Sequence, residues 1–291
     1  MKDIIITIVV SEKDPAGMNI KDNLIKRSQF KITKEKYEGN LIYEHKDAET
    51  RLVTISEETI DHDDIDKKLS FLKENNNLDK IIIIYATKHS SRSGIPSLTA
   101  HTPGNWGNAE MGGQDRLLCK ASEQFVKEAI IYMEKRHSEI SELKNFDVVQ
   151  EATHHGPYLE SHVMFIEIGS LENEWKNQIA GDLIAETIMH LIENAKSIIS
   201  KKNITAIGIG GTHTMSNFKK IILNENIAFS HVCPKYALEN LNEENLKSAL
   251  SQSTRPAEII IFDWKGLGKE KDRIVSLVKE SGIPYKRSKD F

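Results

Sequence analysis

The 291-residue chain contains only two cysteines, Cys119 and Cys233. Two thiols cannot build a disulfide framework, and they are too few for the cysteine-rich spacings typical of structural zinc sites. No apolar run approaches the roughly 20 residues that a membrane helix needs. The short apolar run at residues 4–10 is followed at once by charged residues, which is unlike a signal peptide. We therefore expect a cytoplasmic protein with no membrane segment.

The chain also lacks a strong excess of charge, because 39 Lys and Arg residues face 43 Asp and Glu residues, for a formal net charge of −4. Any contact with a nucleic acid must therefore come from a local basic patch. Residues 86–101 contain Lys88 and Arg92 and no acidic residue. Residues 265–291 contain eight Lys and Arg against four Asp and Glu, although an ordinary solvated helix face would have the same composition.

Short apolar runs alternate with segments of helical periodicity along the whole chain. Buried strands are predicted for the apolar, mostly β-branched runs at 4–10, 81–86, 146–153, 162–168, 204–209 and 258–262. Shorter strands are expected at 41–43, 52–55, 98–102, 228–232 and 283–286. Helices are expected at 18–27, 63–74, 114–137, 177–200, 217–226, 241–250 and 268–281. The alternation predicts one continuous α/β domain over residues 1–291, a three-layer α/β/α sandwich with a mostly parallel, mixed central sheet.

The stretch Glu151-Ala-Thr-His-His-Gly-Pro-Tyr158 carries the densest group of chemically active side chains. Its histidines, His154 and His155, follow a predicted buried strand, and Glu167 ends the next one. Neighbouring side chains on an extended chain point to opposite faces, so one histidine could enter a cleft while the other packs. The pattern indicates a metal or acid–base site, although two solvated loop histidines would look the same.

Three further strand ends carry imidazoles, at His89, His101 and His213. Loops at the carboxyl ends of parallel strands meet at one edge of an open sheet, so we expect these histidines to surround one pocket with His154 and His155. Imidazole and carboxylate ligands without thiols suit zinc in a hydrolytic role. Without a metal, the same histidines could act as general bases, with backbone N–H groups of glycine turns holding an oxyanion.

Several motifs, in this order, resemble the archaeal and plant type of D-aminoacyl-tRNA deacylase over about residues 1–286. They are Lys88-His-Ser-Ser-Arg-Ser-Gly-Ile-Pro-Ser-Leu-Thr-Ala-His101, Gly104-Asn-Trp-Gly107, Glu151-Ala-Thr-His-His-Gly-Pro157, Glu167-Ile-Gly-Ser170 with Glu174-Trp175, and Gly210-Gly-Thr-His213. The resemblance implies a phosphorylase/peptidyl-tRNA hydrolase-like fold. It also implies hydrolysis of the ester between a D-amino acid and the 3′ end of tRNA, with zinc as cofactor. The expected partner is the acceptor end of D-aminoacyl-tRNA, bound by a monomer.

The resemblance also implies that the active cleft holds His89, His101, His154, His155, Glu167 and His213, but it leaves open which of the histidines are ligands and which are bases. The expected catalytic residues are His89, His101, His154, His155 and His213. The expected metal ligands are His154, His155, Glu167 and His213. The expected substrate-binding residues are Lys88, Ser90, Arg92, Asn105, Trp106, Gly210, Gly211 and Trp264. Trp106 and Trp264 could stack on the terminal adenine, or could be rim tryptophans that pack a loop.

One motif departs from the family pattern. Gly-Gly-Gly-His-Tyr is expected where this chain has Gly210-Gly-Thr-His-Thr214, so Thr214 removes an aromatic surface beside His213. Two other hypotheses remain open from the sequence. One is a zinc-dependent amidohydrolase or aminopeptidase that acts on small substrates. The other is a non-catalytic RNA-binding module of the same fold.

Overall fold

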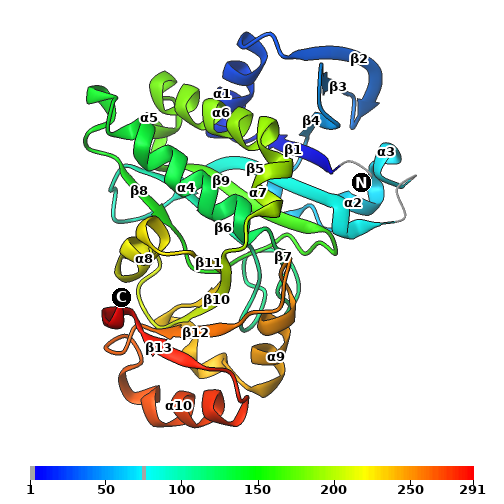
Figure 1. Ribbon diagram of the computed structural model, residues 1–291. Coiled ribbons are helices and arrows are strands. Elements are labelled where there is room, and N and C mark those ends of the chain that lie inside the picture. The colour runs from blue at the N-terminus through cyan, green and yellow to red at the C-terminus, as the bar shows by residue number, and fades with distance from the viewer. Residues whose placement is uncertain (1–3, 74–76) are drawn as a thin grey trace.

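The computed structural model describes residues 4–73 and 77–291, and its strands form two sheets. The larger sheet has the order β2-β3-β4-β1-β5-β9-β6-β8, with β7 beside β9. The smaller sheet has the order β11-β10-β12-β13. Figure 1 shows the larger sheet in the upper part of the molecule and the smaller sheet below it. The predicted class, mixed α/β with a mostly parallel central sheet flanked by helices, is confirmed, but the division into two sheets was not predicted.

The centre of the larger sheet is parallel. Its strands β4 (Thr50–Ile55), β1 (Ile5–Ser11), β5 (Ile81–Ser90) and β9 (His162–Ser170) are almost completely buried. Strands covered on both faces consist of near-continuous apolar runs, which is why the sequence located them. At one edge, β2 (Phe30–Tyr37) and β3 (Asn40–His45) form an antiparallel hairpin. At the other, β6 (Ser97–His101) is antiparallel to β9 and parallel to β8 (Asp147–Gln150).

Helices cover both faces of this sheet. On one face, α1 (Pro15–Lys26), α6 (Gln178–Glu193) and α4 (Glu123–His137) pack side by side over the core that includes Ile6, Ile8 and Val10. On the other, α2 (Ile65–Lys68) and α3 (Ser70–Lys73) pack over the core that includes Val9. Successive residues of β1 thus point to opposite faces, as expected for a strand. The short helices α5 (Glu172–Trp175) and α7 (Ala195–Ser200) flank α6.

Three predicted helices differ from the structure. The helix expected at 63–74 is divided into α2 and α3, and residue 74 lies outside the described residues. The helix expected from residue 114 begins only at Glu123, because residues 114–122 form a loop and the short strand β7 (Lys120–Ala121). The helix expected at 177–200 is interrupted at Asn194, whose side-chain amide donates to the carbonyl of His190.

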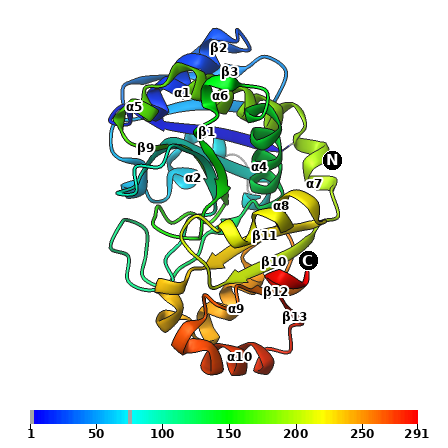
Figure 2. The same cartoon turned by 90° about the vertical axis from the view of Figure 1, so that its left-hand side faces the viewer.

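The smaller sheet is entirely parallel and contains β10 (Ile204–Ile209), β11 (Ile227–Cys233), β12 (Ile259–Phe262) and β13 (Tyr285–Arg287). One face packs on α9 (Glu243–Ser251) and α10 (Lys271–Glu280), and the other joins the main core through α4 and α8 (Lys219–Asn224). Figure 2 shows α4 beside α8 and β11, between the two sheets. The sheets therefore share one apolar layer.

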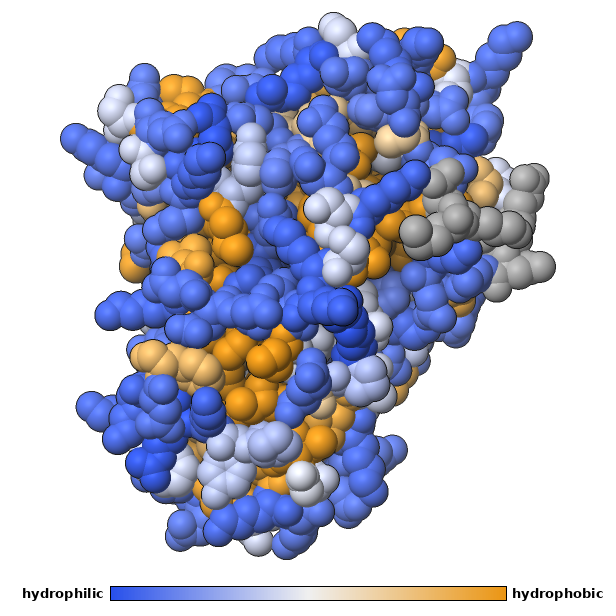
Figure 3. All heavy atoms as spheres, viewed as in Figure 1, coloured by the Kyte–Doolittle hydropathy of each residue, from blue (hydrophilic) through white to orange (hydrophobic). Residues whose placement is uncertain are grey.

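Of the helices that lie in residues 4–73 and 77–291, none combines the length and apolarity needed to cross a membrane. Hydrophilic residues dominate the face of the molecule in Figure 3, where hydrophobic residues show through in separate patches.

Candidate active site between the two sheets

A row of three side chains forms the floor of the site. Glu167 on β9 is paired in register with Thr87 on β5 and with Thr99 on β6, so all three side chains lie on the same face of the sheet. The Thr87 hydroxyl donates to Glu167 Oε1 at 2.7 Å, and the Thr99 hydroxyl lies 3.4 Å from Oε2. The Glu167 side chain, which is 3% exposed, is therefore held in one orientation.

His89 and His101 lie two residues beyond Thr87 and Thr99, so they share the face of Glu167. The predicted loop after residue 86 is wrong at this point, because β5 continues to Ser90 and carries His89 on the strand itself. Gly169 on the neighbouring strand makes room for this ring, since a Cβ at Gly169 would lie 2.7 Å from His89 Cδ2. His101 is fully buried, with Nε2 3.6 Å from Glu167 Oε2.

A second buried carboxylate, Glu151, connects three of the histidines. It follows β8 directly and is 1% exposed. Its Oε1 lies 3.1 Å from His89 Nδ1, and its Oε2 lies 2.9 Å from His213 Nε2 and 3.6 Å from His154 Nε2. The sequence motif contained Glu151 without assigning it a role. The available signal was its position directly after a buried strand, where a carboxylate needs polar partners.

The segment after β8 also joins the two sheets. The Ala152 N–H donates to the carbonyl of His213 at 2.8 Å, and the Thr153 N–H donates to the carbonyl of Val232 on β11 at 3.0 Å. These bonds hold His213, which follows β10 of the smaller sheet, against the larger one. Its ring centre lies 4.3 Å from that of His154 and 5.7 Å from that of His89.

One ring nitrogen of each of the three partly buried histidines at the pocket, His154, His155 and His213, is already occupied. His154 Nδ1 lies 2.7 Å from the carbonyl of Ala152, and His155 Nδ1 lies 2.6 Å from the carbonyl of Gly156. His213 Nδ1 lies 3.1 Å from the Tyr236 hydroxyl. The carbonyls beside His154 and His155 accept a hydrogen from Nδ1, which leaves Nε2 of these two rings as the base or metal ligand. Both nitrogens of His213 are occupied, because its Nε2 faces Glu151.

The five predicted histidines therefore lie together, as expected. The ring of His101 stacks on that of His154 at 4.4 Å and meets the edge of His155 at 5.0 Å. The expected arrangement, in which parallel strands of one sheet bring all the histidines to the same edge, was wrong. The strand β6 runs antiparallel to β9, so His101 reaches the cluster from the opposite direction, and His213 comes from the other sheet.

The two buried carboxylates control the charge of two histidines. Burial lowers the pKa of His89, but the contact with Glu151 outweighs burial and raises that pKa to about 9. In the same way, Glu167 outweighs burial at His101 and raises the pKa of that imidazole. Burial would raise the pKa values of both carboxyls, but His213 and His89 lower the pKa of Glu151, and His101 lowers that of Glu167.

His154 and His155 are shifted in the other direction. Burial, assisted by the charges of His155 and His101, holds the pKa of His154 well below its ordinary value. Burial and the charge of His101 lower the pKa of His155 to about 4. Both rings are therefore neutral near pH 7, which is the form that binds a metal ion.

The residues present fit a metal ion. Among the described residues, three groups place one ligand atom from each member within 4.8 Å of the others. The groups are His101–His154–His155, His89–Glu151–His213 and His101–Glu151–Glu167. The four predicted ligands are thus divided among three groups. Within the described part of the chain, both oxygens of Glu151 and both ring nitrogens of His101 are buried without a well-aligned hydrogen bond. A bound cation would give such atoms partners.

Two pockets open from the cluster and share His154 and His155. One, here called the β5 pocket, has a volume of about 230 Å³ and is lined by Thr87–Ser90, Ile60, Met111 and Phe165 among others. The other, here called the Tyr236 pocket, has a volume of about 350 Å³ and is lined by Asn105, Asn108, Tyr236 and Asn240 among others. A molecule that spans both pockets would place its central bond beside the two histidines.

The predicted substrate-binding residues divide into two sets. Lys88 and Ser90 line the β5 pocket, with Lys88 Nζ 3.3 Å from Glu58, while Arg92 is exposed beyond the end of β5. Asn105 lines the Tyr236 pocket, but its amide donates to the carbonyls of Gly112 and Gln114 and so holds the loop. Trp106, for which stacking on the adenine and packing of a rim loop were both open, is 3% exposed and donates from Nε1 to the carbonyl of Val232, so it offers no open face for stacking.

The predicted residues of the smaller sheet lie beside the cluster rather than in it. Gly210 and Gly211 have φ values of +92° and +86°, and a Cβ at Gly210 would lie 2.8 Å from the carbonyl oxygen of Asp263. These glycines therefore allow the turn that delivers His213. The ring of Trp264 is covered by cations, with the Arg287 guanidinium 4.0 Å and Lys271 Nζ 5.2 Å from its centre.

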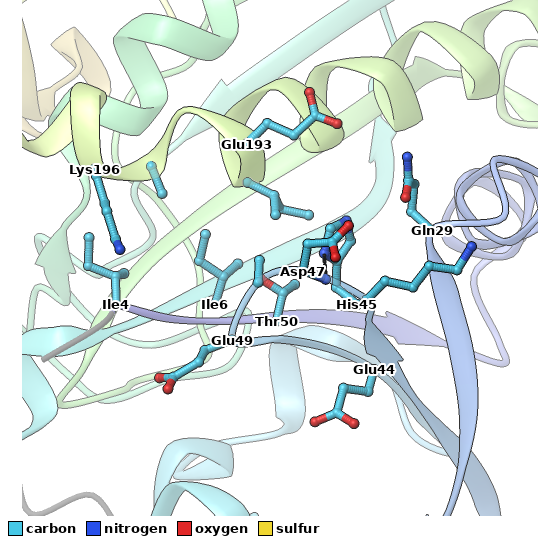
Figure 4. Close-up of a pocket in the computed structure, with 14 residues that line it drawn as sticks. Ile4, Ile6, Gln29, Glu44, His45, Asp47, Glu49, Thr50, Glu193 and Lys196 are labelled. Carbon is cyan, nitrogen blue, oxygen red and sulfur yellow. Dashed lines mark hydrogen bonds between the residues drawn. The ribbon is translucent and has the colours of Figure 1, made fainter.

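A larger pocket of about 820 Å³ lies elsewhere, between the turn that joins β3 to β4 and the helices α6 and α7. Figure 4 shows its lining, with Glu193 and Lys196 on the helices and His45, Asp47 and Glu49 on or near the strands. Burial lowers the pKa of His45. All three groups of possible metal ligands found among the described residues lie in the histidine cluster, so we assign the active site there despite its smaller pockets.

Comparison with known proteins agrees with this assignment. Residues 75–286 match the family model described as D-aminoacyl-tRNA deacylase. The chain is 38% identical over 280 residues to the D-aminoacyl-tRNA deacylase of Pyrococcus furiosus, covering 96% of this chain and 98% of that protein. It is 37% identical over 282 residues to that of Thermococcus onnurineus, with the same coverage. A crystal structure of a conserved protein of unknown function superposes with a TM-score of 0.85 at 32% identity, covering 100% of this chain and 97% of that one.

Proposed function

The chain belongs to the D-aminoacyl-tRNA deacylase family, and we propose that it hydrolyses the ester that joins a D-amino acid to the 3′ end of tRNA. The observation that supports this proposal most strongly is the meeting of five histidines and two buried carboxylates where two pockets join. An aminoacyl ester is already activated, so its hydrolysis needs mainly a placed water and a group that stabilises the oxyanion. The products are a free D-amino acid and tRNA.

We propose zinc as the cofactor, held by His101, His154 and His155. The oxygens near their second ring nitrogens support this choice, since Glu167 faces His101 and backbone carbonyls face the other two. Three imidazole ligands leave a position open, as in catalytic zinc sites. When bound, zinc supplies hydroxide at neutral pH and polarises the ester carbonyl.

The remaining residues of the cluster would move protons or hold the groups that do. His89 lines the β5 pocket and is charged near pH 7 through Glu151, so it can stabilise the oxyanion and donate a proton to the departing ribose oxygen. His213 is one-third exposed, but its Nε2 faces Glu151 and its Nδ1 faces the Tyr236 hydroxyl, so it holds Glu151 in place and does not take the proton of the attacking water. Glu151 is a positioning residue, because it is buried behind both imidazoles.

We propose that the acceptor stem of tRNA lies across two groups of basic residues, one on each sheet. Lys88 lies near the end of β5 and Arg92 lies just beyond it, and the basic residues between Lys265 and Lys289 lie mainly on the smaller sheet and its helix α10. Phosphate contacts of this kind would make binding sensitive to salt. We further propose that the protein acts as a monomer in the cytoplasm.

The direct test compares release of tyrosine from D-Tyr-tRNA and from L-Tyr-tRNA by the purified protein. We expect release from the D-form, at least 100-fold slower release from the L-form, and loss of activity after zinc is chelated, with recovery when zinc is added back. Equal rates on both substrates, or no release from the D-form, would reject the proposal. Full activity of the chelated protein would reject the proposal of a zinc cofactor but not that of deacylase activity, and the histidines would then carry out the catalysis.

A further inference from the structure

The two pockets that share His154 and His155 differ in chemistry. In the β5 pocket, the side chains of Ile60, Met111 and Phe165 give a largely apolar lining around the histidines. In the Tyr236 pocket, the lining includes the amides of Asn108 and Asn240, whereas the Asn105 amide is bonded to the loop. An aminoacyl ester of a nucleotide has the same two-part character, with an amino acid on one side of the scissile bond and a ribose and base on the other.

Tyr236 is unusual among the aromatic residues of this structure because 55% of its surface is exposed, although it lies in the binding region. Its hydroxyl lies 3.1 Å from His213 Nδ1, and its ring is inclined by 26° to that of His213 at 6.4 Å. Burial and the charge of Glu151 raise the pKa of the phenol to about 12, so the hydroxyl keeps its proton. The contact between the Tyr236 hydroxyl and His213 thus holds the ring in one orientation. Little side-chain conformational entropy is then lost when a ligand binds to the exposed face of the ring.

We propose that the Tyr236 pocket binds the terminal adenosine of the substrate, with the adenine stacked on the ring of Tyr236 and the amino acid in the β5 pocket. This inference rests on the proposed function and assigns the two halves of its substrate. Aromatic rings bind bases through stacking, and asparagine amides match the donor and acceptor pattern of an adenine edge. Asn108 and Glu239 are exposed at the rim, so the pocket remains open for the preceding nucleotides.

The volumes support this assignment rather than the reverse. Pockets for small ligands usually measure about 300–1,000 Å³, and the Tyr236 pocket reaches this range at 350 Å³. The β5 pocket, at 230 Å³, is the smaller and suits the smaller amino acid. The shared edge at His154 and His155 then lies at the ester bond.

The test uses the full-length protein, with D-Tyr-tRNA and D-tyrosine ethyl ester as substrates and AMP as a probe of the pocket. Replacing Tyr236 by Ala should raise the KM for D-Tyr-tRNA by about 5- to 100-fold, the loss expected for one base–aromatic stack. It should also weaken AMP binding by calorimetry to the same extent. The Tyr236→Phe variant keeps the ring and loses the hydroxyl, so its AMP affinity should stay within about threefold of the wild type.

Two results separate stacking from a purely structural role. If Tyr236→Ala lowers kcat/KM equally for the tRNA and the ethyl ester and leaves AMP binding unchanged, the residue only positions His213 and the inference is wrong. A matched change in the other pocket, Met111→Ala, should alter the preference between D-Tyr-tRNA and D-Ala-tRNA and leave AMP affinity as it is. A wild-type protein that binds AMP through Tyr236 but never cleaves D-Tyr-tRNA would reject the proposed function, and with it the place of the amino acid, while the Tyr236 pocket would still be shown to bind adenosine.

Discussion

Replacing Glu151 by Gln removes the charge on which the histidine cluster depends. The buried carboxylate lies 3.1 Å from His89 and 2.9 Å from His213, and glutamine keeps its shape. Raising the pKa of His89 from 6.5 to about 9 corresponds to on the order of 3 kcal/mol of stability. We expect the variant to lose about this much stability in the metal-free protein, and to lose at least 100-fold in kcat because His89 and His213 are no longer oriented.

The pH dependence gives the sharper test. A histidine whose pKa is raised by folding contributes stability that is fully present below its unfolded value, near 6.5, and lost as the pH rises through about 9. A glutamate whose pKa is lowered by folding contributes stability above about 4.5 that is lost at lower pH. The difference in stability between wild type and Glu151→Gln should therefore be largest near pH 5–6.5 and should shrink toward pH 10.

Urea unfolding of the metal-free proteins at pH 6 and pH 10, followed by tryptophan fluorescence, measures this difference. The Glu258→Gln variant is the matched control, because Glu258 is exposed and its loss should change stability by less than about 0.5 kcal/mol. A difference that is the same at both pH values, or larger at pH 10, would show that Glu151 does not hold His89 in its charged form.

Three further predictions concern other parts of the site. His154→Ala should lower kcat at least 100-fold and reduce bound zinc measured by mass spectrometry, whereas His190→Ala, whose ring contacts Glu128 outside the cluster, should keep both. Arg92→Ala should raise the KM for tRNA and lower the slope of log affinity against log salt by about 0.7–0.9; an unchanged slope would exclude a phosphate contact. Phe165→Ala, which removes the ring stacked on Tyr85 at 4.7 Å, should cost about 3–5 kcal/mol in urea unfolding, and a cost below about 1 kcal/mol would contradict the packing.

The strands of the parallel core were predictable because their signal is local. In β1, β5, β9 and β10, burial on both faces requires apolar side chains at nearly every position, and the sequence shows this directly. The clustering of the histidines was predictable for a related reason. Polar side chains at the ends of neighbouring buried strands commonly line the same cleft.

Other features depend on contacts that no local pattern records. The strand β2 has one buried residue, Phe30, and its exposed polar side chains give no apolar run. The start of α4 was misplaced because Leu118 is buried at helical spacing from later apolar residues, although it belongs to a loop. The division into two sheets follows from which strands pair, and sequence-distant pairing is set by the tertiary structure.

The site residues show the same limit. Glu151 is decisive only because three imidazoles surround it, and Tyr236 only because its hydroxyl reaches His213. Trp106 was a candidate for stacking on the adenine or for packing a rim loop, but its ring belongs to the core that packs on the smaller sheet. Apart from His154, which lies three residues from Glu151, the partners lie more than 20 residues away, so local spacing does not reveal them.

The contacts between the two sheets have a consequence for how the protein folds during synthesis. The bonds from residues 152 and 153 to the smaller sheet, and the contact of Glu151 with His213, can form only after strands from both ends of the chain have assembled. A polypeptide emerging from the ribosome thus carries the larger sheet long before it carries a complete centre. Catalytic activity therefore requires that the smaller sheet has folded and docked on the larger one. A product truncated before the smaller sheet would have no activity, whereas a change of substrate selectivity would not be expected.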